Sequence, residues 1–169
     1  MGGMTSCRSH KHKEKAYVGE TIEKKGKKKK DNKGNNNSTP YGHEIAQEAQ
    51  RWVGTPYGYG CNEKGVATDC SGLVLTVYLD IADVKLPRNS AEQADFCDNI
   101  EEGEIEEGDL VFFATGKDKS RISHVGVMID EIRFVHSSSS KGVIISEMST
   151  PYYQRTFRKY GRVPLNQHN

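Results

Sequence analysis

The sequence contains no run of about 18 apolar residues, the length that a membrane-spanning helix needs, so it predicts no transmembrane segment. Four cysteines among 169 residues are too few for a scaffold held together by disulfides. The spacings Cys-x-x-Cys and His-Glu-x-x-His, which mark many zinc sites, are both missing. With 24 Lys and Arg against 23 Asp and Glu, the formal net charge is only +1, and the sequence shows no internal repeat. These absences leave a hydrophilic, non-repeating chain that must build an ordinary apolar core.

The charge balance conceals two parts of opposite sign. Residues 8–33 carry eleven basic and four acidic side chains, a net +7, whereas residues 34–169 carry 13 basic and 19 acidic side chains, a net −6. Residues 1–39 hold few apolar side chains, so burial would not offset the entropy lost on ordering them. We therefore predict a disordered basic tether at residues 1–38, a folded domain at 39–165 and a short tail at 166–169. The tether lacks interleaved aromatic rings, so it predicts no specific nucleic-acid site.

Met4-Thr5-Ser6-Cys7 places small residues before a cysteine, as at the end of a bacterial lipoprotein signal. The charged and apolar regions of an export signal do not precede it in this chain. Two interpretations remain open. Cys7 belongs to a truncated lipoprotein signal and carries a lipid that attaches the protein to a membrane, or it is an exposed cysteine without a role.

The pattern of apolar residues predicts helices first and strands second. Helical spacing occurs in residues 43–53 and 71–82, and Ser90-Ala91-Glu92-Gln93 has the form of a capping box that starts a third, short helix. The glycine-rich residues 55–69 between them predict a loop. Strands are expected at residues 109–114, 123–130, 132–137, 143–148 and 159–163. The predicted fold class is α+β, with N-terminal helices packed on a mostly antiparallel sheet of about five strands.

Cys70 is the candidate nucleophile because it lies where the glycine-rich loop turns into the second predicted helix. Unpaired backbone N–H groups and the positive end of the helix dipole would stabilise its thiolate, and the same N–H groups could hold an oxyanion. The alternative is a buried cysteine that acts as a small apolar residue. Cys61 and Cys97 lack this setting, and a disulfide between them stays open.

A nucleophilic thiol needs a base, and His124 and His136 lie on two consecutive predicted strands. An odd-residue turn around Asp130 would pair His124 with His136 and place both imidazoles on one face of the sheet, whereas a two-residue turn would separate them. On one face, one histidine can accept the Cys70 proton while the other orients it. Two alternatives remain: ordinary strand histidines, or a zinc site with Cys70, His124 and His136 as three ligands.

Six motifs in order make the chain similar to the NlpC/P60 family of cell-wall cysteine peptidases. Each motif is weak by itself, but together they extend across residues 43–163, nearly all of the predicted domain. They lie at residues 55–60, 69–73, 86–93, 107–113, 123–126 and 136–143. One departure is Cys61, which stands where the family has a second glycine after its tyrosine loop. The loop from there to Cys70 is also slightly longer than in many members.

The resemblance implies a papain-like α+β fold with a catalytic triad. Cys70 matches the nucleophile, His124 the base and His136 the polar residue that orients the base. Tyr57 matches a tyrosine of the active-site groove that assists the oxyanion site. Ser71, the residue after Cys70, flanks the nucleophile and is assigned to the same part of the groove. The family requires neither a cofactor nor a metal.

The resemblance also implies a substrate and a location. Asp69, Arg88 and Ser90 match residues of the substrate groove, although Arg88 could equally be a surface charge. Family members hydrolyse amide bonds in peptidoglycan stem peptides, often between D-glutamate and a diamino acid, so we expect a monomeric enzyme of the bacterial cell envelope. Two alternatives share the fold: a thiol amidase or acyltransferase that acts on a substrate outside the wall, and a catalytically silent wall-binding module.

Overall fold

A computed structural model describes residues 41–165, and the predicted tether, Cys7 and the tail lie outside these residues. The prediction of a domain boundary near residue 38 therefore stays a prediction. Within the described residues, no helix is long and apolar enough to cross a membrane. The helices are α1 (Gly42–Gln50), α2 (Cys70–Ala82), α3 (Ser90–Phe96), α4 (Pro151–Thr156) and the short 3-10 helix η1 (Glu102–Glu104).

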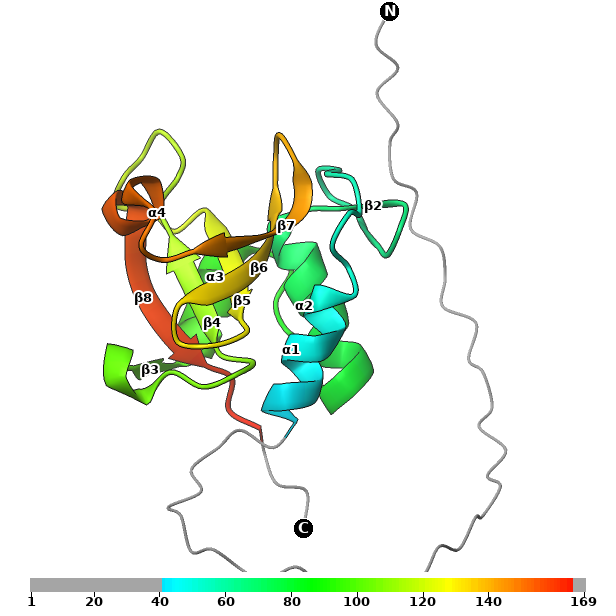
Figure 1. Cartoon of the computed structure of the whole chain (residues 1–169), viewed down its shortest axis with the longest axis horizontal. Helices are drawn as coiled ribbons and strands as arrows, with labels where there is room; N and C mark the ends of the chain where they lie inside the picture. The colour runs from blue at the N-terminus through cyan, green and yellow to red at the C-terminus, as the bar shows by residue number, and fades with distance from the viewer. Residues whose placement is uncertain (1–40, 166–169) are drawn as a thin grey trace, which may run out of the picture. The chain divides into compact units, whose positions relative to one another are not determined.

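Six strands form one sheet in the order β3-β8-β4-β5-β6-β7, and every neighbouring pair is antiparallel (Figure 1). Two further strands make a small separate hairpin ahead of α2. The architecture confirms the predicted α+β class. The strands are β1 (Asn62–Glu63), β2 (Ala67–Thr68), β3 (Asp98–Ile100), β4 (Leu110–Phe113), β5 (His124–Met128), β6 (Arg133–Ser138), β7 (Gly142–Glu147) and β8 (Phe157–Arg162).

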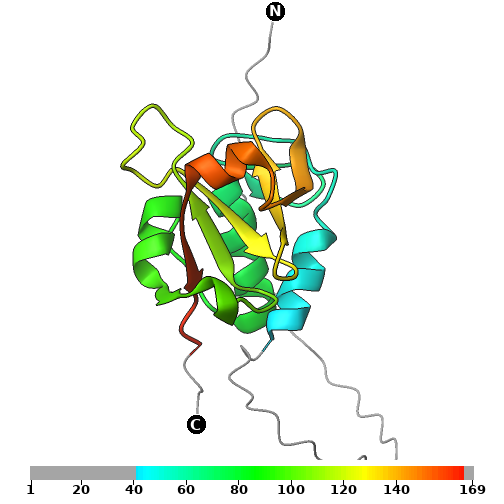
Figure 2. The same cartoon turned by 60° about the vertical axis from the view of Figure 1, so that its left-hand side comes forward.

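The sheet divides the apolar side chains into two clusters because successive strand residues point to opposite faces. In β4, Leu110 and Phe112 face the helices, whereas Val111 and Phe113 belong to the cluster on the opposite face. The helices α1 and α2 lie side by side against the first face, as Figures 1 and 2 show. Six of the 13 residues of α2 are buried, and the helix packs against β5 and β6, so the sheet fixes the position of its first residue.

Several local predictions differ from the structure. The first helix ends at Gln50 rather than Val53, because the chain tightens into a turn in which Trp52 and Val53 donate hydrogen bonds three residues back. The predicted capping box at Ser90–Gln93 is wrong: the side chain of Asn89 accepts the N–H of Glu92 and caps α3. The side chain of Gln93 instead reaches the carbonyls of Ser71 and Pro87.

The short elements were not predicted. The hairpin β1–β2 lies inside the expected loop, β3 joins the edge of the sheet beside β8, and α4 follows β7. The strands β1, β2 and β3 have two or three residues each, too few to show an alternation of apolar and polar side chains. The strand β3 is the sixth strand of a sheet expected to have about five.

A buried ion pair joins the neighbouring strands β4 and β8 at one end of the sheet. Asp109 is 1% exposed and precedes β4, and its two carboxylate oxygens accept hydrogen bonds from Nε and Nη2 of Arg162 on β8, both at 2.8 Å. The same carboxylate accepts the backbone N–H of Glu106 at 2.7 Å. This carboxylate therefore fixes β8 and the turn before β4 together.

We expect the substitution Asp109→Ala to lower the free energy of unfolding by about 3 kcal/mol, because it leaves the largely buried guanidinium of Arg162 without its bidentate partner. The matched control is Arg51→Ala, which breaks an exposed pair with Glu48 and should cost less than about 1 kcal/mol. Urea unfolding followed by circular dichroism measures both changes. Equal losses in the two variants would contradict this role of Asp109.

Candidate active site

The candidate nucleophile Cys70 is the first residue of α2, at the edge of the helix-side core. The preceding residue, Asp69, caps the helix: its carboxylate accepts the N–H of Gly72 at 2.8 Å. The backbone N–H groups of Val125 on β5, of Ser71 and of Cys70 itself lie near the sulfur and act to lower the pKa of the thiol. The helix start and β5 thus bring three N–H donors around one half-buried thiol.

The resting thiol is protonated, contrary to the prediction of a stabilised thiolate. Burial, followed by the negative charge of Asp69, raises the pKa of Cys70 from 9.0 to about 11, and the three N–H groups only partly oppose this rise. The helix terminus is evident in the sequence, whereas the desolvation of the thiol depends on the fold. A protonated thiol can attack only if a base removes its proton.

The two strand histidines contact each other directly. Nε2 of His124 lies 2.8 Å from Nδ1 of His136, and the two rings are nearly perpendicular with centroids 4.9 Å apart. The structure therefore confirms that both imidazoles share one face of the sheet. Because Nε2 of His124 faces His136, Nδ1 is the ring nitrogen that this contact does not use.

The predicted register of this hairpin is wrong by two residues. Met128 pairs with Phe134 and Val127 with Val135, so His124 is not directly opposite His136. The turn is longer than expected because the Asp130 carboxylate accepts the N–H groups of Ile132 and Arg133. A shift of two residues keeps the parity of the strand, so the histidines stay on one face.

A glycine on β5 makes room for the second histidine. A Cβ added at Gly126 would lie 2.6 Å from a ring carbon of Phe134 and 3.3 Å from Cβ of His136. Any larger residue would therefore displace the aromatic packing that surrounds His136. This explains why the segment Ser123-His124-Val125-Gly126 ends in glycine.

Burial keeps both histidines neutral. The pKa of His124 is lowered from 6.5 to about 4 by desolvation, and the pKa of His136 falls to about 3 through desolvation and the charge of His124. Neutral imidazole is the form that can accept a proton from Cys70. The arrangement is suited to general-base activation of a thiol.

Sequence reasoning missed two hydroxyl groups that contact His136. Its Nε2 lies 2.9 Å from Oγ of Ser146 on β7 and 3.1 Å from Oη of Tyr153 on α4. Ser146 pairs with Phe134, two residues from His136, so strand parity alone places it on the histidine face. Tyr153 gave no comparable signal, because it lies in the unpredicted helix α4.

Arg88 belongs to the site and is not an independent surface charge. Its guanidinium forms two hydrogen bonds with Asp69, at 3.0 and 2.7 Å, and a third with Oγ of Ser71 at 2.9 Å. Asp69 also accepts the N–H of Gly60 at 2.7 Å, which ties the tyrosine loop to the helix start. Ser90, predicted in the same groove, is buried at the first position of α3.

The remaining predicted residue, Tyr57, is 36% exposed and lies on the loop beside the nucleophile. Burial raises its pKa, and the charges of Cys70 and Asp69 raise it further, so its hydroxyl group stays protonated and able to donate. Its neighbour Gly58 donates its N–H to the carbonyl of Thr68, which anchors the loop to the residues before Cys70.

The zinc alternative does not match the geometry of these side chains. Within residues 41–165, no group of three His, Cys, Asp or Glu side chains is placed to share a metal ion. His124 and His136 direct a nitrogen at each other rather than at a common point. Cys97 has a free thiol, so the disulfide between Cys61 and Cys97 that the sequence left open is not formed.

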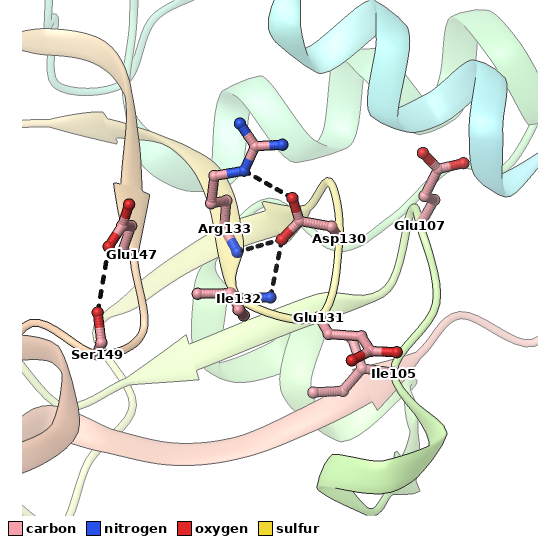
Figure 3. Close-up of a pocket in the computed structure, with 8 residues that line it drawn as sticks. All are labelled: Ile105, Glu107, Asp130, Glu131, Ile132, Arg133, Glu147 and Ser149. Atoms are coloured by element: carbon pink, nitrogen blue, oxygen red, sulfur yellow. Dashed lines mark hydrogen bonds and ion pairs between the residues drawn. The ribbon is translucent and has the colours of Figure 1, made fainter.

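A hollow elsewhere on the surface contains none of these residues (Figure 3). Its lining includes Ile105, Ile132 and Glu131, and Figure 3 shows Asp130 turned back onto its own turn and bonded to Arg133. It offers no thiol or imidazole, so we place the candidate active site at Cys70 and not in this hollow.

The residues around Cys70 lie within a stretch that matches a known family. The sequence model of the NlpC/P60 family matches residues 54–162. The chain belongs to the NlpC/P60 family. It is accordingly a hydrolase of the NlpC/P60 type, and its relatives carry endopeptidase names.

Two relatives of this NlpC/P60 protein come from Escherichia coli K12. The probable endopeptidase NlpC is 40% identical over 120 residues, which are 70% of this chain and 76% of that protein. The murein DD-endopeptidase MepS/murein LD-carboxypeptidase is 36% identical over 120 residues, or 70% of this chain and 61% of that protein. A crystal structure of an NlpC/P60 family protein from Bacillus cereus superimposes with a TM-score of 0.67 at 27% identity, covering 75% of this chain and 42% of that chain. The chain thus spans less than half of that larger protein.

The lowered pKa of His124 predicts the acid limit of activity for this NlpC/P60 hydrolase. If His124 is the base and must be neutral to accept the thiol proton, kcat/KM should fall as the pH drops through about 4 and not through the ordinary value of 6.5. The measurement is kcat/KM against pH with a soluble peptide that the enzyme cleaves. An acid limb at pH 6.5 or above would contradict the burial argument.

Unfolding must be monitored in the same experiment. The pKa values of His124 and His136 are lower in the folded chain than in the unfolded chain, so the unfolded chain binds these protons more readily. The contribution of these two histidines to the free energy of unfolding is therefore fully present above about pH 6.5. It declines as the pH falls toward their folded-state pKa values of about 4 and about 3. Circular dichroism at each pH separates loss of the fold from loss of the base.

Proposed function

We propose that the protein is a cysteine peptidase that hydrolyses amide bonds in peptidoglycan stem peptides, between D-glutamate and a diamino acid. The observation that supports this proposal most strongly is the hydrogen-bonded pair of His124 on β5 and His136 on β6, because Val125, the residue after His124, lies at the Cys70 thiol. The name of the murein endopeptidase relative supports the substrate class.

In the first half of the reaction, Nδ1 of His124 accepts the thiol proton as the Cys70 sulfur attacks the scissile carbonyl carbon. The carbonyl oxygen becomes an oxyanion, stabilised by the backbone N–H groups near the sulfur and by the hydroxyl group of Tyr57. The carbon–nitrogen bond then breaks, and protonated His124 gives its proton to the leaving amine. The acyl group remains on Cys70 as a thioester.

In the second half, His124 is neutral again and accepts a proton from water as that water attacks the thioester carbon. The carbon–sulfur bond breaks, a carboxylic acid leaves, and the proton on His124 returns to the sulfur. His136 keeps its hydrogen bond to Nε2 of His124 and so holds the imidazole plane during both halves.

The residues around the helix start supply the groove. We assign Asp69, Arg88 and Ser90 to substrate binding, with the fork of Arg88 on Asp69 fixing the loop before the nucleophile. The enzyme would act in the bacterial cell envelope as a monomer, without a cofactor, and a lipid on Cys7 would attach it to the membrane. The alternative enzyme with the same fold is a thiol amidase or acyltransferase that acts on a substrate outside the wall.

The direct test is digestion of purified peptidoglycan, with the released stem peptides identified by mass spectrometry. We expect Cys70→Ala to lower the rate of release at least about a thousandfold, because it removes the nucleophile. The matched control is Cys97→Ala, which removes a free thiol from the core and should leave the rate within about twofold. Equal release by wild type and Cys70→Ala would rule out the nucleophile. Cleavage of other amides but not of peptidoglycan would favour the amidase alternative.

Deletion of residues 1–38 tests the predicted division of the chain. If these residues only localise the enzyme, kcat/KM on a soluble stem peptide should stay within about twofold of the full chain. The rate on intact cell wall is then expected to fall, since the +7 segment and Cys7 are lost. Loss of activity on the soluble peptide would show that the catalytic unit begins earlier than residue 39.

A further inference from the structure

The third member of the candidate triad, His136, has a partner on each ring nitrogen. Nδ1 faces His124, and Nε2 faces the hydroxyl groups of Ser146 and Tyr153 at 2.9 and 3.1 Å. The ring itself is 2% exposed, so each N–H that it carries needs an acceptor inside the protein. The position of its single proton therefore depends on these partners.

The function of His124 requires one of the two neutral forms of His136. If Nδ1 of His124 is to accept the thiol proton, its other nitrogen, Nε2, must carry the hydrogen and donate it to Nδ1 of His136. His136 must then be protonated at Nε2. In the reverse arrangement, Nδ1 of His136 donates to His124, which moves the His124 hydrogen to Nδ1 and blocks its function as a base.

The hydroxyl groups favour the productive form. Oγ of Ser146 lies 3.4 Å from Oη of Tyr153, and a hydrogen donated to Tyr153 would leave the lone pairs of Ser146 to accept from Nε2 of His136 at 2.9 Å. A proton on Nε2 of His136 thereby gains a partner. All hydrogen bonds from His124 through His136 and Ser146 to Tyr153 then point in one direction.

The Tyr153 hydroxyl is held by aromatic packing. The Tyr153 ring lies perpendicular to Phe134 with centroids 5.0 Å apart, and it also contacts the rings of Phe113 and His136 at 5.3 and 5.5 Å. These rings come from β4, β6 and α4, so the hydroxyl group is fixed from three elements. The six-residue helix α4 thus positions the Tyr153 hydroxyl group next to His136.

We propose that Ser146 and Tyr153 are positioning residues that hold His136 in its Nε2-protonated form and thereby keep Nδ1 of His124 available as the base. This inference rests on the proposed function for its catalytic consequence. Neither residue touches the reacting atoms; both act through His136.

The proposal is tested on the full chain with ¹⁵N-labelled histidine, by reading the protonation of each ring nitrogen from its NMR shift and assigning His136 through His136→Asn. Wild type should carry the His136 proton on Nε2. Tyr153→Phe frees the Ser146 hydroxyl to donate to Nε2, so the ratio of the two forms should shift toward Nδ1 by roughly five- to tenfold. Tyr152→Phe, which removes a hydroxyl from the exposed neighbouring residue, should leave the ratio unchanged.

We expect kcat to fall as the fraction of His136 that is protonated at Nε2 falls. Ser146→Ala and Tyr153→Phe should each lower kcat with KM unchanged, and the double variant, which leaves the Nε2 proton without an acceptor, should lower kcat by roughly tenfold or more. Ser146→Thr keeps the hydroxyl and should restore the rate. The rate of iodoacetamide alkylation at Cys70, mapped by mass spectrometry, should fall in the same order.

A wild-type His136 protonated at Nδ1, or a ratio unaffected by both single variants, would overturn the proposal. A rise in KM without a change in the ratio would show a merely structural role and would also overturn it. Because alkylation and NMR need no peptidoglycan, they decide this proposal even if the enzyme fails to cleave the wall. These measurements thereby distinguish failure of the proposed peptidase function from failure of the positioning role of Ser146 and Tyr153.

Discussion

The hydrogen bond between the buried imidazoles of His124 and His136 is the interaction on which the site depends. It exists because β5 and β6 form an antiparallel hairpin whose register keeps both side chains on one face. Gly126 leaves space for the second ring, and the Asp130 turn sets the length of the hairpin. The contact between the two imidazoles thus depends partly on the turn that joins β5 to β6.

A balance between burial and polar contacts governs the nucleophile. Three N–H groups surround the Cys70 sulfur, yet desolvation and Asp69 keep its pKa above the ordinary value. The carboxylate that opposes the thiolate is indispensable to the architecture, because it caps α2, holds Gly60 and receives the fork of Arg88. In the proposed mechanism, this cost to the thiolate is offset when neutral His124 removes the proton during attack.

Much of this arrangement could be predicted from the sequence. Cys70 at a loop-to-helix junction and an even separation between His124 and His136 were enough to predict the helix start and the two histidines on one face, because helix starts and strand parity are local properties. The register, the cap of α3 and the raised pKa of Cys70 were not predictable in the same way, since they depend on the turn at Asp130, on Asn89 and on burial. Tyr153 was the hardest to foresee: it reaches the site from a helix of six residues that leaves no periodic signal.

The claim that Cys70 is a nucleophile activated by His124 is tested most directly with a stem peptide whose scissile amide is replaced by an electrophilic ketone. The account predicts a covalent adduct on Cys70 alone, formed more slowly in His124→Ala and prevented by excess intact stem peptide. Modification of another residue, or an undiminished rate in His124→Ala, would contradict it.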